Sequence, residues 1–136
     1  MMVAEADEAR AVRRPIRSFQ DLEAWQHSRR LVRAIYEATR RFPKEELYGL
    51  TNQIRRAAIS VPSNIAEGYG RGSLTDYIRY LQTARGSLNE LQTQLLLSQD
   101  LGYLQASAAE RLLAEAQVCS RILQGLIASL KRTRGQ

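Results

Sequence analysis

Four stretches of the chain place apolar or small residues at alternating spacings of three and four. They cover residues 21–41, 50–67, 74–99 and 105–131. This spacing keeps one stripe of side chains on one face of an α-helix. No stretch alternates apolar and polar residues with the period of two that a half-buried strand shows. The pattern therefore predicts four amphipathic helices and an all-α fold.

The spacing also predicts which side chains form the core. The stripe of the first helix consists of Trp25, Ser28, Val32, Ile35, Thr39 and Phe42. Cys119 stands on the stripe of the fourth helix, so we interpret it as a small core residue rather than a reactive thiol. Additional apolar residues widen the third and fourth helices, among them Ile78, Tyr80, Leu96, Leu97, Leu113, Ile122 and Ile127. They indicate either a wider core or a homo-oligomer whose contacts use these two helices.

Short connections favour an up-down-up-down antiparallel four-helix bundle, because neighbouring helices joined by short links run in opposite directions. Pro62 falls inside the second helix, where it removes a backbone hydrogen bond and predicts a kink. Ser60, Ser63 and Asn64 stand beside it and are placed to satisfy the backbone groups that the kink frees. The predicted organisation is an N-terminal tail over 1–17, a bundle over 18–130 and a basic C-terminal tail over 131–136.

Composition narrows the classes of function. The 136 residues contain 20 basic and 14 acidic side chains, a net charge of +6, with one cysteine and one histidine. A single cysteine excludes an intramolecular disulfide framework, and a single histidine excludes a multi-histidine metal site within one chain. The sequence has no apolar run long enough to span a bilayer and no apolar signal-peptide core near its start. We therefore expect a cytoplasmic protein with no membrane partner.

Catalytic motifs are missing from the sequence. His27 is the only histidine and has no nucleophile motif near it. The run Gly68–Ser73 lacks the Gly-Lys-Ser/Thr ending of a phosphate-binding loop. It is interpreted as a helix–helix turn, with anion binding by free amides and Arg71 as the alternative. We expect no enzyme activity, no cofactor, no metal and no small-molecule substrate.

Eighteen of the 20 basic residues are arginines, whose planar guanidinium groups suit phosphate. Those on the first two helices can be placed on outward faces, and others follow the glycine run and end the chain. The candidate nucleic-acid-binding residues are Arg29, Arg33, Arg40, Arg55, Arg56, Arg71, Lys131, Arg132 and Arg134. We expect them to neutralise phosphates with little readout of bases. A solvated arginine-rich surface is the alternative interpretation.

Several motifs carry a family resemblance. The second predicted helix carries two of them in succession. They read Leu50-Thr51-x-Gln53-Ile54-Arg55-Arg56-Ala57-Ala58 and Ser60-Val61-Pro62-Ser63-Asn64-Ile65-Ala66-Glu67-Gly68. Phe19-x-Asp21-Leu22-x-x-Trp25-Gln26 comes before them, and Ala84-Arg85-Gly86-Ser87-Leu88-x-Glu90 after them. Over about residues 18–130, the chain resembles the four-helix bundle family first noted in intervening sequences of bacterial large-subunit ribosomal RNA genes. It is also similar to the accessory proteins of diversity-generating retroelements.

The resemblance implies a bundle that assembles into a pentameric barrel. It also implies a structural or assembly role for Pro62, Asn64, Glu67 and Gly68. For the retroelement branch, it implies binding of nucleic acid and of a reverse transcriptase through basic surfaces. The leading hypothesis is a non-enzymatic homo-oligomer, pentameric by resemblance, that binds RNA or DNA. The alternative is a scaffold or adaptor for a protein partner such as a reverse transcriptase.

Overall fold

The chain forms four long helices. The computed structural model describes residues 15–135, and the predicted tail over 1–17 lies mostly outside them. The long helices are α2 (Glu23–Thr39), α3 (Leu50–Tyr69), α4 (Leu74–Asp100) and α5 (Ala106–Arg134). Two short 3-10 helices, η1 (Phe19–Asp21) and η2 (Lys44–Glu46), precede α2 and α3. The described part of the chain contains no strand, so the all-α prediction is confirmed.

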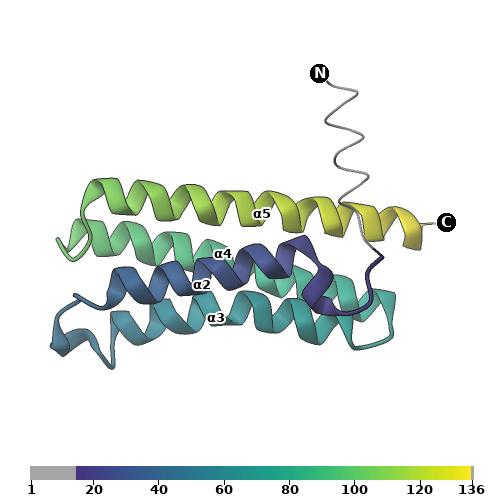
Figure 1. Ribbon diagram of the computed structural model, residues 1–136, viewed down its shortest axis with the longest axis horizontal. Coiled ribbons are helices and arrows are strands. Elements are labelled where there is room, and N and C mark those ends of the chain that lie inside the picture. The colour runs from purple at the N-terminus through teal and green to yellow at the C-terminus, as the bar shows by residue number, and fades with distance from the viewer. Residues whose placement is uncertain (1–14, 136) are drawn as a thin grey trace, which may run out of the picture.

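The four helices lie side by side as a bundle, and the chain reverses direction from each helix to the next (Figure 1). α3 packs against α2 and α4, and α5 packs against α4 and α2. Contacts between α3 and α4 show the opposed directions residue by residue. Ser60 meets Ser87, whereas Glu67, seven residues further along α3, meets Tyr80, seven residues earlier on α4.

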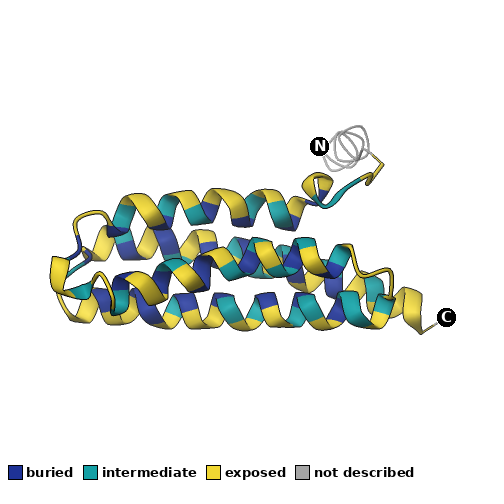
Figure 2. Ribbon diagram, turned by 90° about the horizontal axis from the view of Figure 1, so that it is seen from below, coloured by how far each residue is buried: buried dark blue, intermediate teal, exposed yellow. Residues whose placement is uncertain are grey.

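The core is built from the helix faces that the sequence pattern identifies, except that α2 is rotated about its axis relative to the prediction. Ser28, Ile35, Thr39 and Phe42 are buried as predicted. Trp25 and Val32 are only half-buried, and Ala24 and Leu31 occupy the interior instead. The Trp25 and Val32 side chains pack against the core from the edge of the bundle, and the Phe19 ring of η1 packs edge-on against the Trp25 ring, with 5.3 Å between the ring centroids. Figure 2 shows the resulting bands of buried and exposed residues.

α3 continues as one helix through Pro62. The Asn64 side chain donates hydrogen bonds to the carbonyl and hydroxyl oxygens of Ser60, at 2.7 and 2.9 Å. The predicted kink stays a prediction. Near the end of α3, a Cβ on Gly68 would lie 2.6 Å from Tyr80 Cβ, closer than packed carbon atoms allow. Only glycine therefore permits this approach of α4. The left-handed turn falls at Gly72, with a φ of 77°.

The ends of the helices differ from the predicted bounds by up to three residues. α5 begins at Ala106 without a hydrogen bond from a capping side chain. It continues to Arg134, which places Lys131 and Arg132 in its last turn rather than in a separate tail. Ser73 caps the N-terminus of α4, because its Oγ accepts a hydrogen bond from the Asp76 amide at 3.3 Å.

The additional apolar residues divide between core and surface. Ile78 and Ile127 are buried, and Leu113 and Ile122 are half-buried against the core. The exposed ones on these helices are confined to the end of α4 and the turn after it, at Leu96, Leu97 and Leu101. No helix within residues 15–135 combines the length and apolar character needed to cross a membrane.

Candidate nucleic-acid interface

The predicted arginines of α2 lie on its outer surface. Arg29, Arg33 and Arg40 are all exposed. The Arg29 guanidinium lies over the Trp25 ring, 5.4 Å from its centroid. Arg33 has a carboxylate neighbour, Glu37 Oε1, at 3.9 Å. This exposed ion pair is screened by water and leaves the guanidinium accessible to phosphate.

The two predicted arginines of α3 occupy different environments. Arg56 is exposed. Arg55 is half-buried against α2, where its Nε donates to Thr39 Oγ1 at 2.9 Å and its guanidinium lies 4.5 Å from the centre of the Tyr36 ring. The sequence predicts both as free surface charges, and this is wrong for Arg55. Tyr36 and Thr39 fix its side chain, so Arg55 joins α2 to α3 as well as carrying charge.

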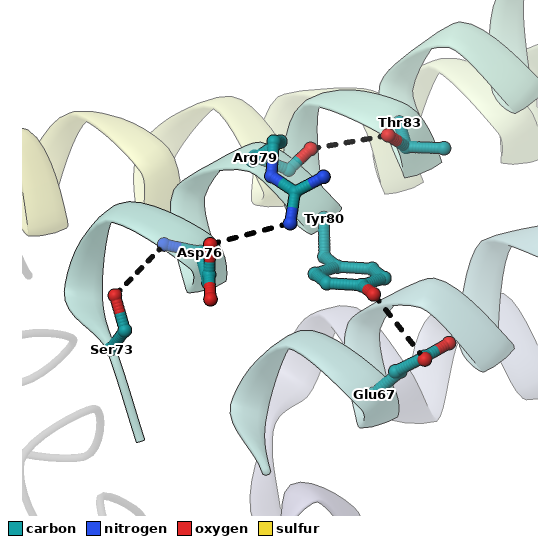
Figure 3. A network of polar contacts seen from close by, with 6 residues as sticks. All are labelled: Glu67, Ser73, Asp76, Arg79, Tyr80 and Thr83. Carbon is teal, nitrogen blue, oxygen red and sulfur yellow. Dashed lines mark hydrogen bonds and ion pairs between the residues drawn. The ribbon is translucent and has the colours of Figure 1, made fainter. Parts of the chain in front are cut away.

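The turn between α3 and α4 carries a compact polar cluster (Figure 3). Arg71 and Arg79 both lie beside the Tyr80 ring, at 5.4 and 5.2 Å from its centroid. The Tyr80 hydroxyl donates to Glu67 Oε1, and Arg79 pairs with Asp76 Oδ1, each at 3.3 Å. A cation over an aromatic face is attracted by the ring quadrupole. Tyr80 therefore holds two guanidinium groups close together at this end of the bundle.

The basic residues of α5 lie at the same end of the molecule. Lys131, Arg132 and Arg134 are exposed in the last turn of α5. The C-terminus and the α3–α4 turn lie at one end of the bundle in Figure 1. The positive charges of Lys131, Arg132 and Arg134 also compensate the partial negative charge at the C-terminus of α5.

The candidate residues thus form two groups rather than one patch. Arg71 and the α5 basic residues lie at the end with the α3–α4 turn, and Arg40, Arg55 and Arg56 lie at the opposite end. Arg55 and Arg71 are 16 positions apart, or about 24 Å along a helix axis. Arg29 and Arg33 lie between the groups on α2. Within residues 15–135, Arg33 is the only candidate with a carboxylate within 4.0 Å.

The residues of the family motif concentrate at the contact between α3 and α4. Asn64 binds Ser60, whose hydroxyl is 2.9 Å from that of Ser87 on α4. Glu67 accepts from Tyr80, and Gly68 allows the close approach of that tyrosine. Pro62 instead lies at the surface between α2 and α3. These positions are consistent with the structural role that the resemblance implies, which stays a prediction.

Three side chains of these surfaces are not among the predicted site residues. Tyr36 holds Arg55 across the α2–α3 contact, whereas Tyr80 and Arg79 lie beside Arg71 at the α3–α4 turn. Arginine and tyrosine are neighbours in the sequence around 69–80, which is the signal that was available. No sequence pattern pairs Tyr36 with Arg55, because they come from different helices.

Other chemistry is limited in the described part of the chain. Cys119 is buried, and burial raises the pKa of its thiol to about 11. His27 Nε2 lies 3.9 Å from Glu23 Oε1 on the same helix. Residues 15–135 contain no cluster of three or more His, Cys, Asp or Glu side chains suited to a metal ion.

Comparison with known families gives one assignment. The family model described as 23S rRNA-intervening sequence protein matches residues 20–125. No curated protein matches the chain significantly. The match covers all of α2, α3 and α4 and most of α5. The chain belongs to the 23S rRNA-intervening sequence protein family.

Proposed function

We propose that this chain is a non-enzymatic RNA-binding protein that holds structured RNA by neutralising its phosphates. The observation that carries the proposal is the exposure of arginines along α2 and at both ends of the bundle, with few carboxylates near them. The net charge of +6 supports the same proposal. The family description names ribosomal RNA, so we take RNA rather than DNA as the partner. The proposal implies a cytoplasmic location.

A salt titration tests this proposal. Fluorescence anisotropy of a labelled RNA stem-loop is measured from low to high salt, with duplex DNA of equal length for comparison. Micromolar binding that weakens steeply with salt is expected, because each phosphate contact releases a counterion. No binding to either probe at low salt would leave the arginines as solvated surface and overturn the proposal.

The structure decides which charge-reversal variant is informative. Arg55 also anchors α3 to α2, so reversing its charge affects folding as well as binding. Arg56 and Arg40 are exposed and lie at the same end of the bundle. Arg40→Glu combined with Arg56→Glu is expected to weaken RNA binding and to flatten its salt dependence, with unfolding midpoints unchanged. Unchanged affinity would remove this end of the bundle from the interface.

We further propose that the protein acts as a homo-oligomer, pentameric as the family resemblance implies. Several protomers would multiply a charge that binds RNA loosely in a single copy. The exposed apolar residues at the end of α4 favour an assembly.

A scaffold or adaptor for a protein partner, such as a reverse transcriptase, is the second candidate. It is favoured by Leu47 and Tyr48, which are exposed in the connection before α3. Substituting both with serine would then abolish capture of the partner while RNA binding stays intact. If RNA binding falls instead, these residues belong to the RNA interface.

A further inference from the structure

Two stripes of side chains meet along the outer line of contact between α2 and α3. We call this surface the α2–α3 seam and define it by Trp25, Arg29, Val32 and Tyr36 of α2 with Arg55, Ile59 and Pro62 of α3. Each stripe follows the spacing of three and four that keeps side chains on one helix face. Because the helices are antiparallel, Tyr36 meets Arg55 at one end and Trp25 approaches Pro62 at the other.

A groove opens in the seam beside Trp25. It encloses about 510 Å³ and is lined by four apolar side chains, with Gln20 and Arg29 at its polar edge. This volume lies within the range of small-molecule sites, about 300–1,000 Å³. Ile59, one of the lining residues, is 41% exposed. The groove is therefore open to solvent and apolar on most of its wall.

Arginines accompany the aromatic rings at both ends of the seam. Arg29 lies over Trp25, and Arg55 lies over Tyr36, which is itself 37% exposed. Arg40 continues the α2 stripe one turn beyond Tyr36 and is exposed. The seam thus alternates flat apolar surface with guanidinium groups. Single-stranded nucleic acid has the complementary alternation of bases and phosphates, and aromatic side chains bind unpaired bases by stacking.

We propose that the α2–α3 seam binds unpaired nucleotides, with a base entering the groove against Trp25 and phosphates contacting Arg29 and Arg55. This inference rests on the proposed RNA-binding function and adds to it the class of nucleotide and the surface that recognises it. Phosphate neutralisation alone does not distinguish paired from unpaired RNA. A stacking site gives the protein a preference for loops, bulges and ends, where bases are free.

Trp25 provides a direct measurement because it is the only tryptophan in the chain. Its fluorescence is followed while the protein is titrated with a uridine 12-mer, an abasic 12-mer of the same charge, and a 12-base-pair RNA duplex. Anisotropy of labelled copies reports binding independently. The uridine strand is expected to quench Trp25 and to bind about tenfold more tightly than the abasic strand, since each base that stacks on an aromatic side chain adds to the affinity.

Matched variants separate stacking from charge. Arg29→Gln and Arg33→Gln each remove one positive charge from α2, but only Arg29 lines the groove. Because Arg29 contacts a phosphate at the groove and Arg33 lies outside it, Arg29→Gln is expected to weaken the uridine and abasic strands more than Arg33→Gln does. On α3, Ile59→Glu places a carboxylate in the groove and is expected to abolish the preference. Gln53→Glu adds the same charge at an exposed position outside the groove and retains it.

The outcomes are distinct. If no probe binds at low salt, the proposed function fails and the inference falls with it. If all probes bind but the uridine and abasic strands bind equally, or Trp25 is not quenched, RNA binding stands and the stacking site is wrong. A change of Trp25 fluorescence with protein concentration alone would show that a second copy of the chain covers the groove, and would also overturn the inference.

Discussion

Gly68 and Gly86 both lie inside helices, yet their surroundings are opposite. A Cβ on Gly68 would lie 2.6 Å from Tyr80 Cβ and 3.3 Å from the Tyr77 ring, whereas a Cβ on Gly86 would meet nothing within 4 Å. Glycine inside a helix lowers stability because it loses more backbone entropy on folding than alanine. The packing of α4 explains glycine at position 68, and nothing within residues 15–135 explains it at position 86.

Alanine substitutions should therefore have opposite effects. Gly68→Ala is expected to lower the free energy of unfolding by about 1–3 kcal/mol, since the added methyl group overpacks the α3–α4 contact. Gly86→Ala is expected to raise it by about 0.5–1 kcal/mol. Urea denaturation of both variants under identical conditions measures the difference. Equal effects of the two substitutions would show that α4 does not approach Gly68 as closely as described.

Cys119 makes stability depend on alkaline pH. Burial raises its pKa from 9.0 to about 11, so the thiol ionises in the unfolded chain first. Its contribution is present below pH 9 and is lost as pH rises through 11, a change of about 2–3 kcal/mol. Cys119→Ala should unfold with a smaller loss of stability between pH 8 and pH 10.5 than the unsubstituted chain. Identical losses would show that other groups control this range.

At the scale of elements, Glu46 of η2 is hydrogen-bonded both to the start of α3 and to the connection between α4 and α5. Its Oε1 accepts a hydrogen bond from the Leu50 amide at the start of α3, at 3.2 Å. Its Oε2 accepts from the Tyr103 hydroxyl in the α4–α5 connection, at 2.9 Å. The Tyr103 ring packs on Phe42 at 5.6 Å. α3 begins after Gly49, which has no capping side chain, so Glu46 supplies the missing acceptor.

Glu46→Ala is expected to lower the free energy of unfolding by about 1 kcal/mol, the usual effect of losing a helix cap. Glu45→Ala removes the neighbouring exposed carboxylate and is the matched control, with little expected effect. Combining Glu46→Ala with Tyr103→Phe in a double-mutant cycle by thermal denaturation tests the link between segments. Strictly additive effects would show that the tyrosine bond contributes nothing.

The helices were predictable from spacing, whereas contacts between helices were not. The period of three and four identified all four helices, and the start of α3 at Leu50 and of α4 at Leu74 agreed with the structure. Spacing alone does not fix how far a helix is rotated. Trp25 and Ala24 differ by one position, and only the neighbouring Phe19 and α3 decide which of them faces inward.

The candidate site shows the same limit. Exposure of Arg29, Arg33, Arg40 and Arg56 followed from helix faces. The burial of Arg55 against Tyr36 did not, because their positions along the chain are 19 residues apart and on different helices. The groove beside Trp25 also depends on two helices, since Ile59 and Pro62 supply its other wall. The residue types predicted a phosphate-binding surface, whereas the packing of α2 against α3 determines which side chains lie together on it.

At the scale of the whole molecule, the candidate basic residues lie at the two ends of the bundle and along α2. A single RNA phosphate backbone contacts only part of such a distribution at once. In an assembly of identical subunits, equivalent groups repeat around the symmetry axis, and simultaneous contacts raise the overall affinity without new chemistry. The oligomeric state therefore determines how the basic groups at Arg40 and Arg132 are used.

Light scattering measures this state directly. In high salt and without RNA, the proposed pentamer has a mass of about 77 kDa, five times the 15.4 kDa chain. Leu97 is exposed near the end of α4, so Leu97→Glu is expected to lower the mass by placing a charge in the proposed contact. Gln99→Glu, two residues along the same helix, is the control. A monomeric mass for the unsubstituted chain at tens of micromolar would contradict assembly, and an unchanged mass for Leu97→Glu would place the contact elsewhere. Because high salt weakens phosphate contacts but not apolar ones, an assembly that persists there is held by protein surfaces and not by bound RNA.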